Sequence, residues 1–168
     1  MNPAAPSNGS EPDLRPFMAG FPTGVSIVTT VDTEKRPHGM TCTSLCSASL
    51  NPPTVLVCLR ANSPTLRALT VSGVFSINVL GQHAESTAAL FASGDPERFD
   101  RVCWRWAADG GGPHLLRAAR AIADCRVGGT RSSGDHAVVF GEVAMITAIS
   151  EAAPLLYGLR RFAVWPHG

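Results

Sequence analysis

The chain has 168 residues, in which 14 Lys and Arg residues nearly balance 13 Asp and Glu residues. This length suits one domain with a hydrophobic core, and the balanced charge argues against a nucleic-acid-binding protein. Charged residues make up only 16% of the chain while 45% is hydrophobic, which argues against disorder and leads us to expect a homodimer that covers part of the surface.

The content of cysteine, glycine and proline further limits the class of protein that the chain can form. The five cysteines are an odd number without a CxxC pair, so we expect no disulfide framework and no metal site, and a cytoplasmic location. The 16 glycines and 13 prolines favour a turn-rich β protein. Residues 1–12 are predicted to form a flexible leader without signal-peptide features, and residues 13–168 a single domain. His38 to Leu59 lacks acidic, Lys and Arg residues but contains Asn-Pro-Pro and many hydroxyls, so we expect no membrane span.

The first half of the chain predicts a short helix followed by strands. Asp13 to Gly20 could form one or two helical turns, and the β-branched alternation of Val25 to Val31 indicates a strand. His38 to Ser49 is expected to be extended, and Thr54 to Leu59 to form an apolar strand. Ser63 followed by Pro64 predicts the start of a helix that runs to about Val71 and ends at Gly73.

The second half predicts more strands with few helices. Strands are expected at Val74–Leu80, Cys103–Trp106 and Arg161–Trp165, a hairpin at Ala119–Thr130 and His136–Ala148 around Ser132–Asp135, a helix at Ala84–Ala92, and a helical turn at Pro154–Tyr157. Short strands, turn-rich connections and a few helices together predict a mainly β protein, a closed antiparallel barrel with short covering helices.

Gly39 to Ser49 is unusual for a strand because it holds five hydroxyl residues and no acid, base or aromatic side chain. Small side chains let a ligand approach the main chain closely, so this segment could form a wall for a planar heterocycle. On composition alone, a tightly packed strand in a barrel corner is the favoured interpretation.

A second motif follows at the start of the predicted helix. Arg60 precedes Ser63-Pro64-Thr65, and the unpaired amides of a helix N-terminus together with hydroxyls and a guanidinium form a site suited to phosphate. A plain helix cap with a surface arginine is the alternative. The order of the two motifs along the chain brings both sites within the length of one nucleotide in a paired sheet.

The sequence resembles the flavin reductase family with the FMN-binding split-barrel fold. The resemblance rests on a series of motifs in the same order along nearly the whole chain: Phe21-Pro22-Thr23-Gly24-Val25, Gly39-Met40-Thr41, Asn51-Pro52-Pro53, Ser63-Pro64-Thr65-Leu66, Gly73 to Leu80, Gly134-Asp135-His136 and Pro154-Leu155-Leu156-Tyr157. It implies a Greek-key split β-barrel and an NAD(P)H:flavin oxidoreductase. Such an enzyme reduces FMN or FAD by hydride transfer from NADH or NADPH and supplies the reduced flavin to a partner monooxygenase.

The resemblance also implies a set of site residues. The flavin-binding set is Thr41, Thr43, Ser44, Leu45, Cys46, Ser47, Cys58, Arg60, Ser63, Thr65 and Phe99, and the set near NAD(P)H is His136 and Tyr157. The isoalloxazine and ribityl chain are expected along Thr43 to Ser47, and the phosphate end along Cys58 to Thr65. No catalytic side chain is assigned, because hydride passes directly between the two cofactors and the protein supplies orientation.

Several alternatives stay open at this stage. His136 could be a strand-end histidine, and Arg160-Arg161 could meet a pyrophosphate or a partner, although a solvated pair is the default. Cys42 and Cys46 are expected on one face of a strand, where packing or backbone exposure is preferred over metal binding. The chain could also be a flavin-binding redox module without turnover, or an oxidase related to pyridoxamine-phosphate oxidases.

Overall fold

The computed structural model describes residues 12–108 and 110–166. Of the expected leader, all but Pro12 lies outside the described residues. The elements in chain order are α1 (Leu14–Ala19), β1 (Thr23–Gly24), β2 (Ser26–Val31), β3 (Pro37–Cys42), β4 (Cys46–Leu50), β5 (Pro53–Arg60), α2 (Pro64–Ser72), β6 (Val74–Leu80), α3 (Glu85–Ser93), β7 (Ala119–Ser133), β8 (His136–Ala148), β9 (Leu155–Gly158) and β10 (Arg161–Val164).

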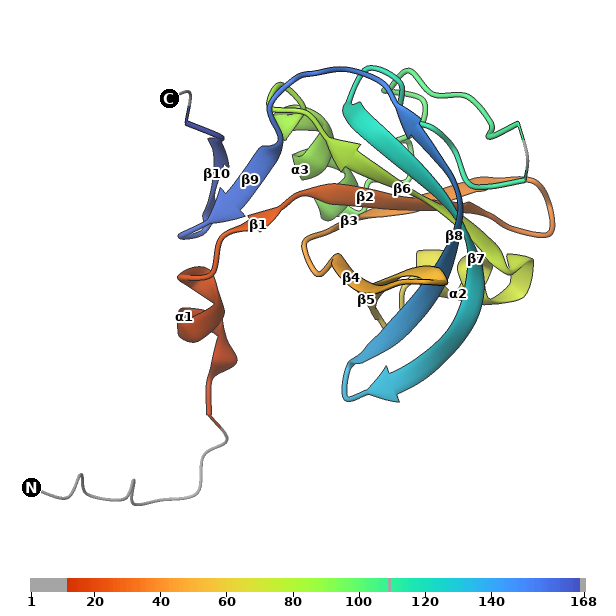
Figure 1. The fold of residues 1–168 in the computed structure, drawn as a ribbon, viewed down its shortest axis with the longest axis horizontal. Coiled ribbons are helices and arrows are strands. Elements are labelled where there is room, and N and C mark those ends of the chain that lie inside the picture. The colour runs from red at the N-terminus through yellow and green to blue at the C-terminus, as the bar shows by residue number, and fades with distance from the viewer. Residues whose placement is uncertain (1–11, 109, 167–168) are drawn as a thin grey trace, which may run out of the picture.

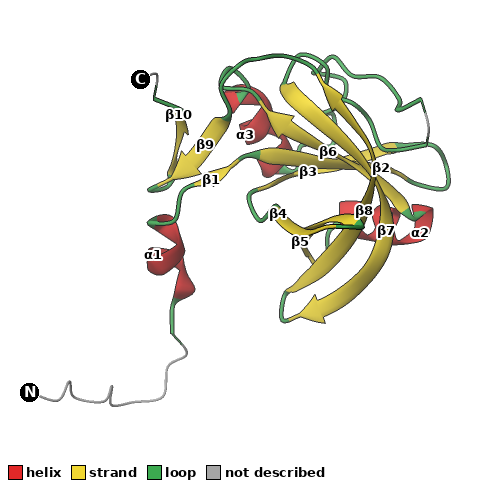
Figure 2. Cartoon of the chain, in the orientation of Figure 1, coloured by secondary structure: helices red, strands yellow, loops and turns green. Residues whose placement is uncertain are grey.

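Seven antiparallel strands curve into a barrel in the order β3-β2-β6-β7-β8-β5-β4 (Figure 1). The chain crosses from β5 through α2 to β6 on the other side of the sheet, which gives a Greek-key order. A small sheet, β1-β9-β10, lies beside the barrel (Figure 2). This architecture confirms the predicted split barrel, with α2 packed on β2 and α3 on β3 as covering helices.

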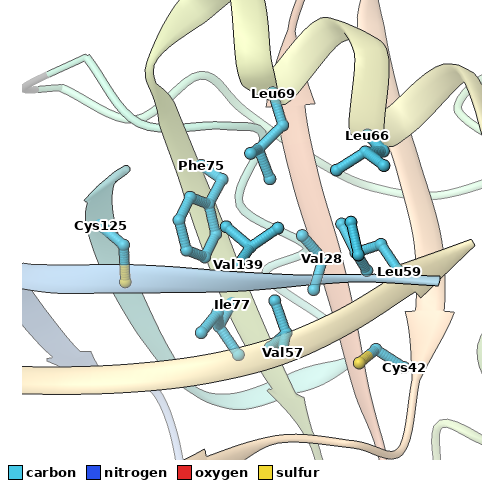
Figure 3. Close-up of a cluster of buried hydrophobic side chains, with 11 residues drawn as sticks. Val28, Cys42, Val57, Leu59, Leu66, Leu69, Phe75, Ile77, Cys125 and Val139 are labelled. Carbon is cyan, nitrogen blue, oxygen red and sulfur yellow. The ribbon is translucent and has the colours of Figure 1, made fainter. Parts of the chain in front are cut away.

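The barrel interior is a cluster of buried aliphatic and aromatic side chains (Figure 3). Val28, Val57, Ile77 and Val139 point inward from four different strands, and Leu69 covers them from α2. All five are at most 1% exposed. Because burial of a side chain of this size contributes roughly 1.5–3 kcal/mol, this cluster makes the barrel a stiff support for the residues at its ends.

Helix α2 begins and ends as predicted. The Ser63 Oγ accepts a hydrogen bond from the Leu66 amide at 3.1 Å, and Pro64 is the first helical residue. Gly73 ends the helix in the left-handed conformation, with φ 71°, which glycine adopts without the steric cost that a Cβ brings.

The predicted extended segment His38–Ser49 is instead two strands. The chain leaves β3 at Cys42 and enters β4 at Cys46, and between them the Ser44 Oγ accepts from the Cys58 amide at 2.8 Å and lies 3.1 Å from the Cys58 carbonyl oxygen. This bond fixes a bend that carries the chain from the β2 side of the barrel to the β5 side. Cys42 is therefore buried and Cys46 exposed, so the expectation of one shared face was wrong.

Two smaller predictions also differ from the structure. The expected helical turn at Pro154–Tyr157 is wrong, because Tyr157 pairs with Thr23 on one side and with Phe162 on the other, as a strand does. The expected strand at Cys103–Trp106 is reduced to one isolated bridge between Arg105 and His114. In the described part of the chain, no helix combines the length and apolar character that a membrane crossing requires.

Candidate flavin and dinucleotide site

A pocket of about 590 Å³ opens where the end of β3, the end of β5, α3 and the β9–β10 hairpin meet. Its polar lining is Thr41, Thr43, Arg60, Ser93, Tyr157, Arg160 and Arg161. A neighbouring pocket of about 530 Å³ beside α1 shares Thr43, Tyr157 and Arg160 with it. Both volumes lie in the usual range for small-molecule sites, roughly 300–1,000 Å³. A hollow of about 650 Å³ around Asp32 and Trp106 is lined by none of the residues predicted to bind flavin or NAD(P)H.

In the hydroxyl-rich segment Gly39–Ser49, some hydroxyls are bonded to protein and others are exposed without a protein partner. The Thr41 Oγ1 donates to the Ala88 carbonyl of α3 at 2.6 Å, and Ser44 is held by Cys58. The side chains of Thr43 and Ser47 are exposed, and within the described residues neither makes a hydrogen bond to protein. Two of the predicted hydroxyls therefore shape the wall, and two others stay available to a ligand.

The predicted phosphate end and the predicted nicotinamide end lie close together. Arg60, the last residue of β5, is paired across the sheet with His136, the first residue of β8. The His136 Nδ1 lies 2.8 Å from the Asp135 Oδ1, and this hydrogen bond, with the charge of His136, lowers the pKa of the Asp135 carboxyl. The Ala61 amide donates to the Asp135 carbonyl at 2.9 Å, so the strand ends and the approach to α2 form one unit.

The Ser63 Oγ caps α2 by accepting a hydrogen bond from the Leu66 amide, and in the described structure its own hydroxyl hydrogen is donated to no protein acceptor. Exposed Arg60 and backbone amides lie at the same helix start. The assignment of Ser63 and Thr65 as flavin contacts stays a prediction, and burial of Thr65 at 2% exposure favours packing for that side chain.

Phe99 is also placed in the interior rather than on the pocket wall. It packs edge-to-face against Phe91 at 5.1 Å and against Trp104 at 5.6 Å between ring centroids. Gly39 of β3 approaches both Phe91 and Phe99 so closely that a Cβ would lie 3.1–3.2 Å from their ring atoms. Phe99 thus packs behind β3, and its assignment as a flavin contact stays a prediction.

The pocket also contains residues that the sequence did not assign to the site, including Met40, Ala89 and Phe162. Arg160 and Arg161 were noted as a pair, but only their position on the hairpin places them in the lining. Among the described residues no group of three or more His, Cys, Asp or Glu side chains could hold a metal ion. The lining suits an organic anion with a planar part, because it combines aromatic faces, open hydroxyls and guanidinium groups.

Comparisons with known proteins identify the family of the chain. The family model described as the flavin reductase like domain matches residues 18–166. The chain belongs to this flavin reductase family. One relative, the flavin reductase (NADPH) of Lentzea aerocolonigenes, is 44% identical over 157 residues, which are 93% of this chain and 91% of the relative.

Two further relatives of this flavin reductase are informative. HsaB of Rhodococcus jostii, the reductase subunit of a flavin-dependent monooxygenase, is 38% identical over 86% of this chain and 72% of its own length. Among solved structures, the NADH:FAD oxidoreductase SgcE6 of Streptomyces globisporus, in complex with NAD and FAD fragments, superimposes with a TM-score of 0.85. It is 33% identical and covers 91% of each chain.

Proposed function

We propose that this chain is an NAD(P)H-dependent flavin reductase, which reduces FMN or FAD by hydride transfer and supplies the reduced flavin to a separate monooxygenase. Family membership over residues 18–166 carries this proposal, since relatives that match most of the chain are reductases of flavins. The flavin, when bound, supplies the hydride-accepting ring. The chain's own residues bind and orient the two cofactors.

The pocket residues fit this role in kind and in place. Thr43 lines the pocket with an open hydroxyl, Ser47 adds a second exposed hydroxyl farther along the same segment, and Arg60 provides a cation just before α2. His136 lies across the sheet from Arg60, where it could contact the nicotinamide donor. These features support a flavin along Thr43–Ser47 with its phosphate near Arg60.

A homodimer is part of the proposal, because one copy of the chain leaves much apolar surface uncovered. Phe17 of α1 is 76% exposed, Leu50 of β4 is 89% exposed and Ile146 of β8 is 69% exposed. Helix α1 has no buried residue and extends away from the barrel (Figure 1). A second copy of the chain packed against these elements would remove their apolar side chains from water. A cytoplasmic location is inferred from the five free thiols.

The direct test is steady-state oxidation of NADH and NADPH with FMN and FAD in all four combinations. We expect turnover with at least one combination. Flavin binding without oxidation of either donor would show that the chain is not a reductase and would favour a flavin-binding module without turnover.

The position of the flavin can be tested with the cysteines already present. Cys46 and Cys103 are exposed, whereas burial raises the pKa of the Cys42 thiol and raises that of Cys125 to about 12. Because thiolates react and buried thiols do not, we expect iodoacetamide to modify exposed Cys46 and Cys103 in preference to buried Cys42 and Cys125. Ligand at ten times its Kd leaves about a tenth of the protein free, so FMN should slow modification of Cys46 about tenfold and leave Cys103, the internal control, unchanged. Equal rates at Cys46 with and without saturating FMN would place the flavin elsewhere.

A further inference from the structure

The turn between β9 and β10 has an unusual backbone for its sequence. Gly158 pairs with Arg161 across the hairpin, so the turn consists of Leu159 and Arg160. Both residues have positive φ, 50° and 60°, as a two-residue hairpin turn requires. Glycine or asparagine usually occupies such positions, because a larger side chain is strained there. The Leu159 amide donates to the Ala19 carbonyl of α1 at 2.7 Å, which holds the turn in place.

This backbone places two consecutive arginines on one pocket. In a regular strand, successive side chains point to opposite faces, yet Arg160 and Arg161 both line the 590 Å³ pocket. The left-handed conformation at Arg160 interrupts the alternation. A strained turn that gathers two guanidinium groups at a cavity is typical of a binding site, where strain is retained for function.

The charge around this pocket is one-sided. Its lining holds Arg60, Arg160 and Arg161, and no acidic side chain among the residues described. Within the same described residues none of the three forms an ion pair, and their shared cavity distinguishes them from the other unpaired arginines of the chain. Unpaired guanidinium groups in one cavity attract a ligand with several negative charges.

We propose that Arg160 and Arg161 bind the 2′-phosphate of NADPH and make NADPH the preferred electron donor. This inference rests on the proposed function, in which Arg60 serves the flavin phosphate near α2. Two adjacent guanidinium groups suit a phosphomonoester dianion, which accepts several charge-assisted hydrogen bonds at once. Arg160 also lines the neighbouring pocket beside α1, so its guanidinium group is available to a ligand in either cavity.

The kinetic test compares both donors in the wild type and in Arg160→Gly/Arg161→Ala. Glycine at position 160 relieves the positive φ, so the variant keeps the turn while it loses both guanidinium groups. We expect the wild type to prefer NADPH at least about tenfold in kcat/KM, and the variant to lose about 10- to 100-fold with NADPH but under about threefold with NADH. Arg117→Ala, which removes an exposed arginine outside both pockets, is the control for net charge and should change neither donor. An equal loss for both donors would overturn the proposal, because the pyrophosphate is common to both.

A binding measurement separates this inference from the proposed function. Calorimetry with adenosine 2′,5′-bisphosphate and with AMP tests the site without turnover. We expect the bisphosphate to bind the wild type at least about tenfold more tightly than AMP, and the double variant to lose this difference. No difference in the wild type would overturn the inference, even in an active reductase. Absence of NAD(P)H oxidation would instead contradict the proposed function. The difference in affinity between the bisphosphate and AMP would then still show whether Arg160 and Arg161 bind a 2′-phosphate.

Discussion

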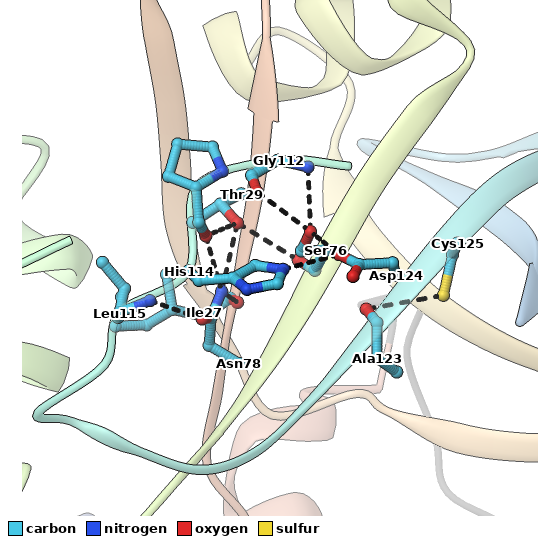
Figure 4. Close-up of polar contacts among 11 residues, drawn as sticks. Ile27, Thr29, Ser76, Asn78, Gly112, His114, Leu115, Ala123, Asp124 and Cys125 are labelled. Atoms are coloured by element: carbon cyan, nitrogen blue, oxygen red, sulfur yellow. Dashed lines mark hydrogen bonds and ion pairs between the residues drawn. The ribbon is translucent and has the colours of Figure 1, made fainter. Parts of the chain in front are cut away.

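Two regions of the barrel are rich in small polar side chains, and they use them in opposite ways. One is the pocket segment Thr41–Ser47. The other, which we call the β2–β6 polar network, consists of Thr29, Ser76, Asn78, His114 and Asp124 (Figure 4). In the network the three hydroxyl and amide side chains have exposures of 0%, whereas Thr43 and Ser47 are exposed.

Every polar side chain on β2 and β6 in this network is hydrogen-bonded to the segment Gly111–Leu115, which covers the barrel. The Thr29 Oγ1 donates to the Pro113 carbonyl at 2.6 Å, and the Ser76 Oγ accepts from the Gly112 amide at 2.8 Å. The Asn78 Oδ1 accepts from the Leu115 amide at 2.8 Å. The network thus replaces the water that these buried groups would otherwise require.

The difference shows that hydroxyl content by itself does not mark a binding site. In the β2–β6 polar network the hydroxyls are satisfied inside the protein and stabilise it. In the pocket segment, the hydroxyls of Thr43 and Ser47 have no protein partner among the described residues, so their hydrogen-bonding capacity is left for a ligand. Thr43 also lines both neighbouring pockets. Three substitutions test whether the two regions divide stability and binding in this way.

The largest effect is expected for Asn78→Ala. This change leaves the Leu115 amide without its acceptor and removes the Nδ2 donor from the Ile27 carbonyl oxygen, which lies 3.2 Å away. A buried group left unsatisfied costs about 1–3 kcal/mol, so we expect the free energy of unfolding to fall by about 3 kcal/mol in urea denaturation. Asn62→Ala, at an exposed loop position, is the matched control. A loss for Asn78→Ala no larger than that of the control would show that the network does not stabilise the barrel.

A smaller effect is expected for Ser44→Ala, because Ser44 is one of the two half-buried hydroxyl residues of the pocket segment that bond to protein. The substitution removes the acceptor of the Cys58 amide, and the loss of one such bond costs about 1–2 kcal/mol. Ser47→Ala, three residues along the same segment and exposed, should stay within about 0.5 kcal/mol of the wild type. Urea denaturation of both variants checks this, and equal stabilities would remove the distinction between shaping and open hydroxyls.

Local sequence signals were sufficient where local interactions decide the structure. Helix α2 is specified by Ser63, Pro64 and Gly73, all of which act within one turn of the helix ends. The β7–β8 hairpin follows in the same way from two long strand-like runs around Gly134, which has φ 58°. The motifs that carry the family resemblance predicted the barrel fold and the class of activity.

Elements that depend on distant partners were not predictable. The break between β3 and β4 is set by Ser44 and Cys58, which are 14 residues apart. Strand β9 exists because β1 and β10 pair with its two edges, and the short run Leu155–Gly158 carries no strand signal of its own.

The β2–β6 polar network also could not be predicted from the sequence. In the sequence of β6, Ser76 and Asn78 alternate with Phe75 and Ile77, and the polar face of such a strand is usually exposed to water. The structure buries them because Gly111–Leu115 folds over that face. A Cβ at Gly112 would collide with the Thr29 backbone, so this close approach needs glycine, and nothing in the local sequence of β6 indicates the covering segment.

The smallest effect on stability, and the sharpest test of the comparison, is expected for Thr43→Val. This substitution keeps the shape of the side chain and removes an exposed hydroxyl without a protein partner in the described structure, so the free energy of unfolding should change by less than about 0.5 kcal/mol. If the hydroxyl is reserved for the flavin, FMN affinity should still fall about 3- to 10-fold, the equivalent of one hydrogen bond of about 0.5–1.5 kcal/mol. Flavin titration by fluorescence quenching measures this, with Thr130→Val on the exposed part of β7 as the control. A destabilised Thr43→Val variant, or unchanged FMN affinity, would mean that the open hydroxyl of the pocket segment belongs to the protein's own structure, as the hydroxyls of the β2–β6 polar network do.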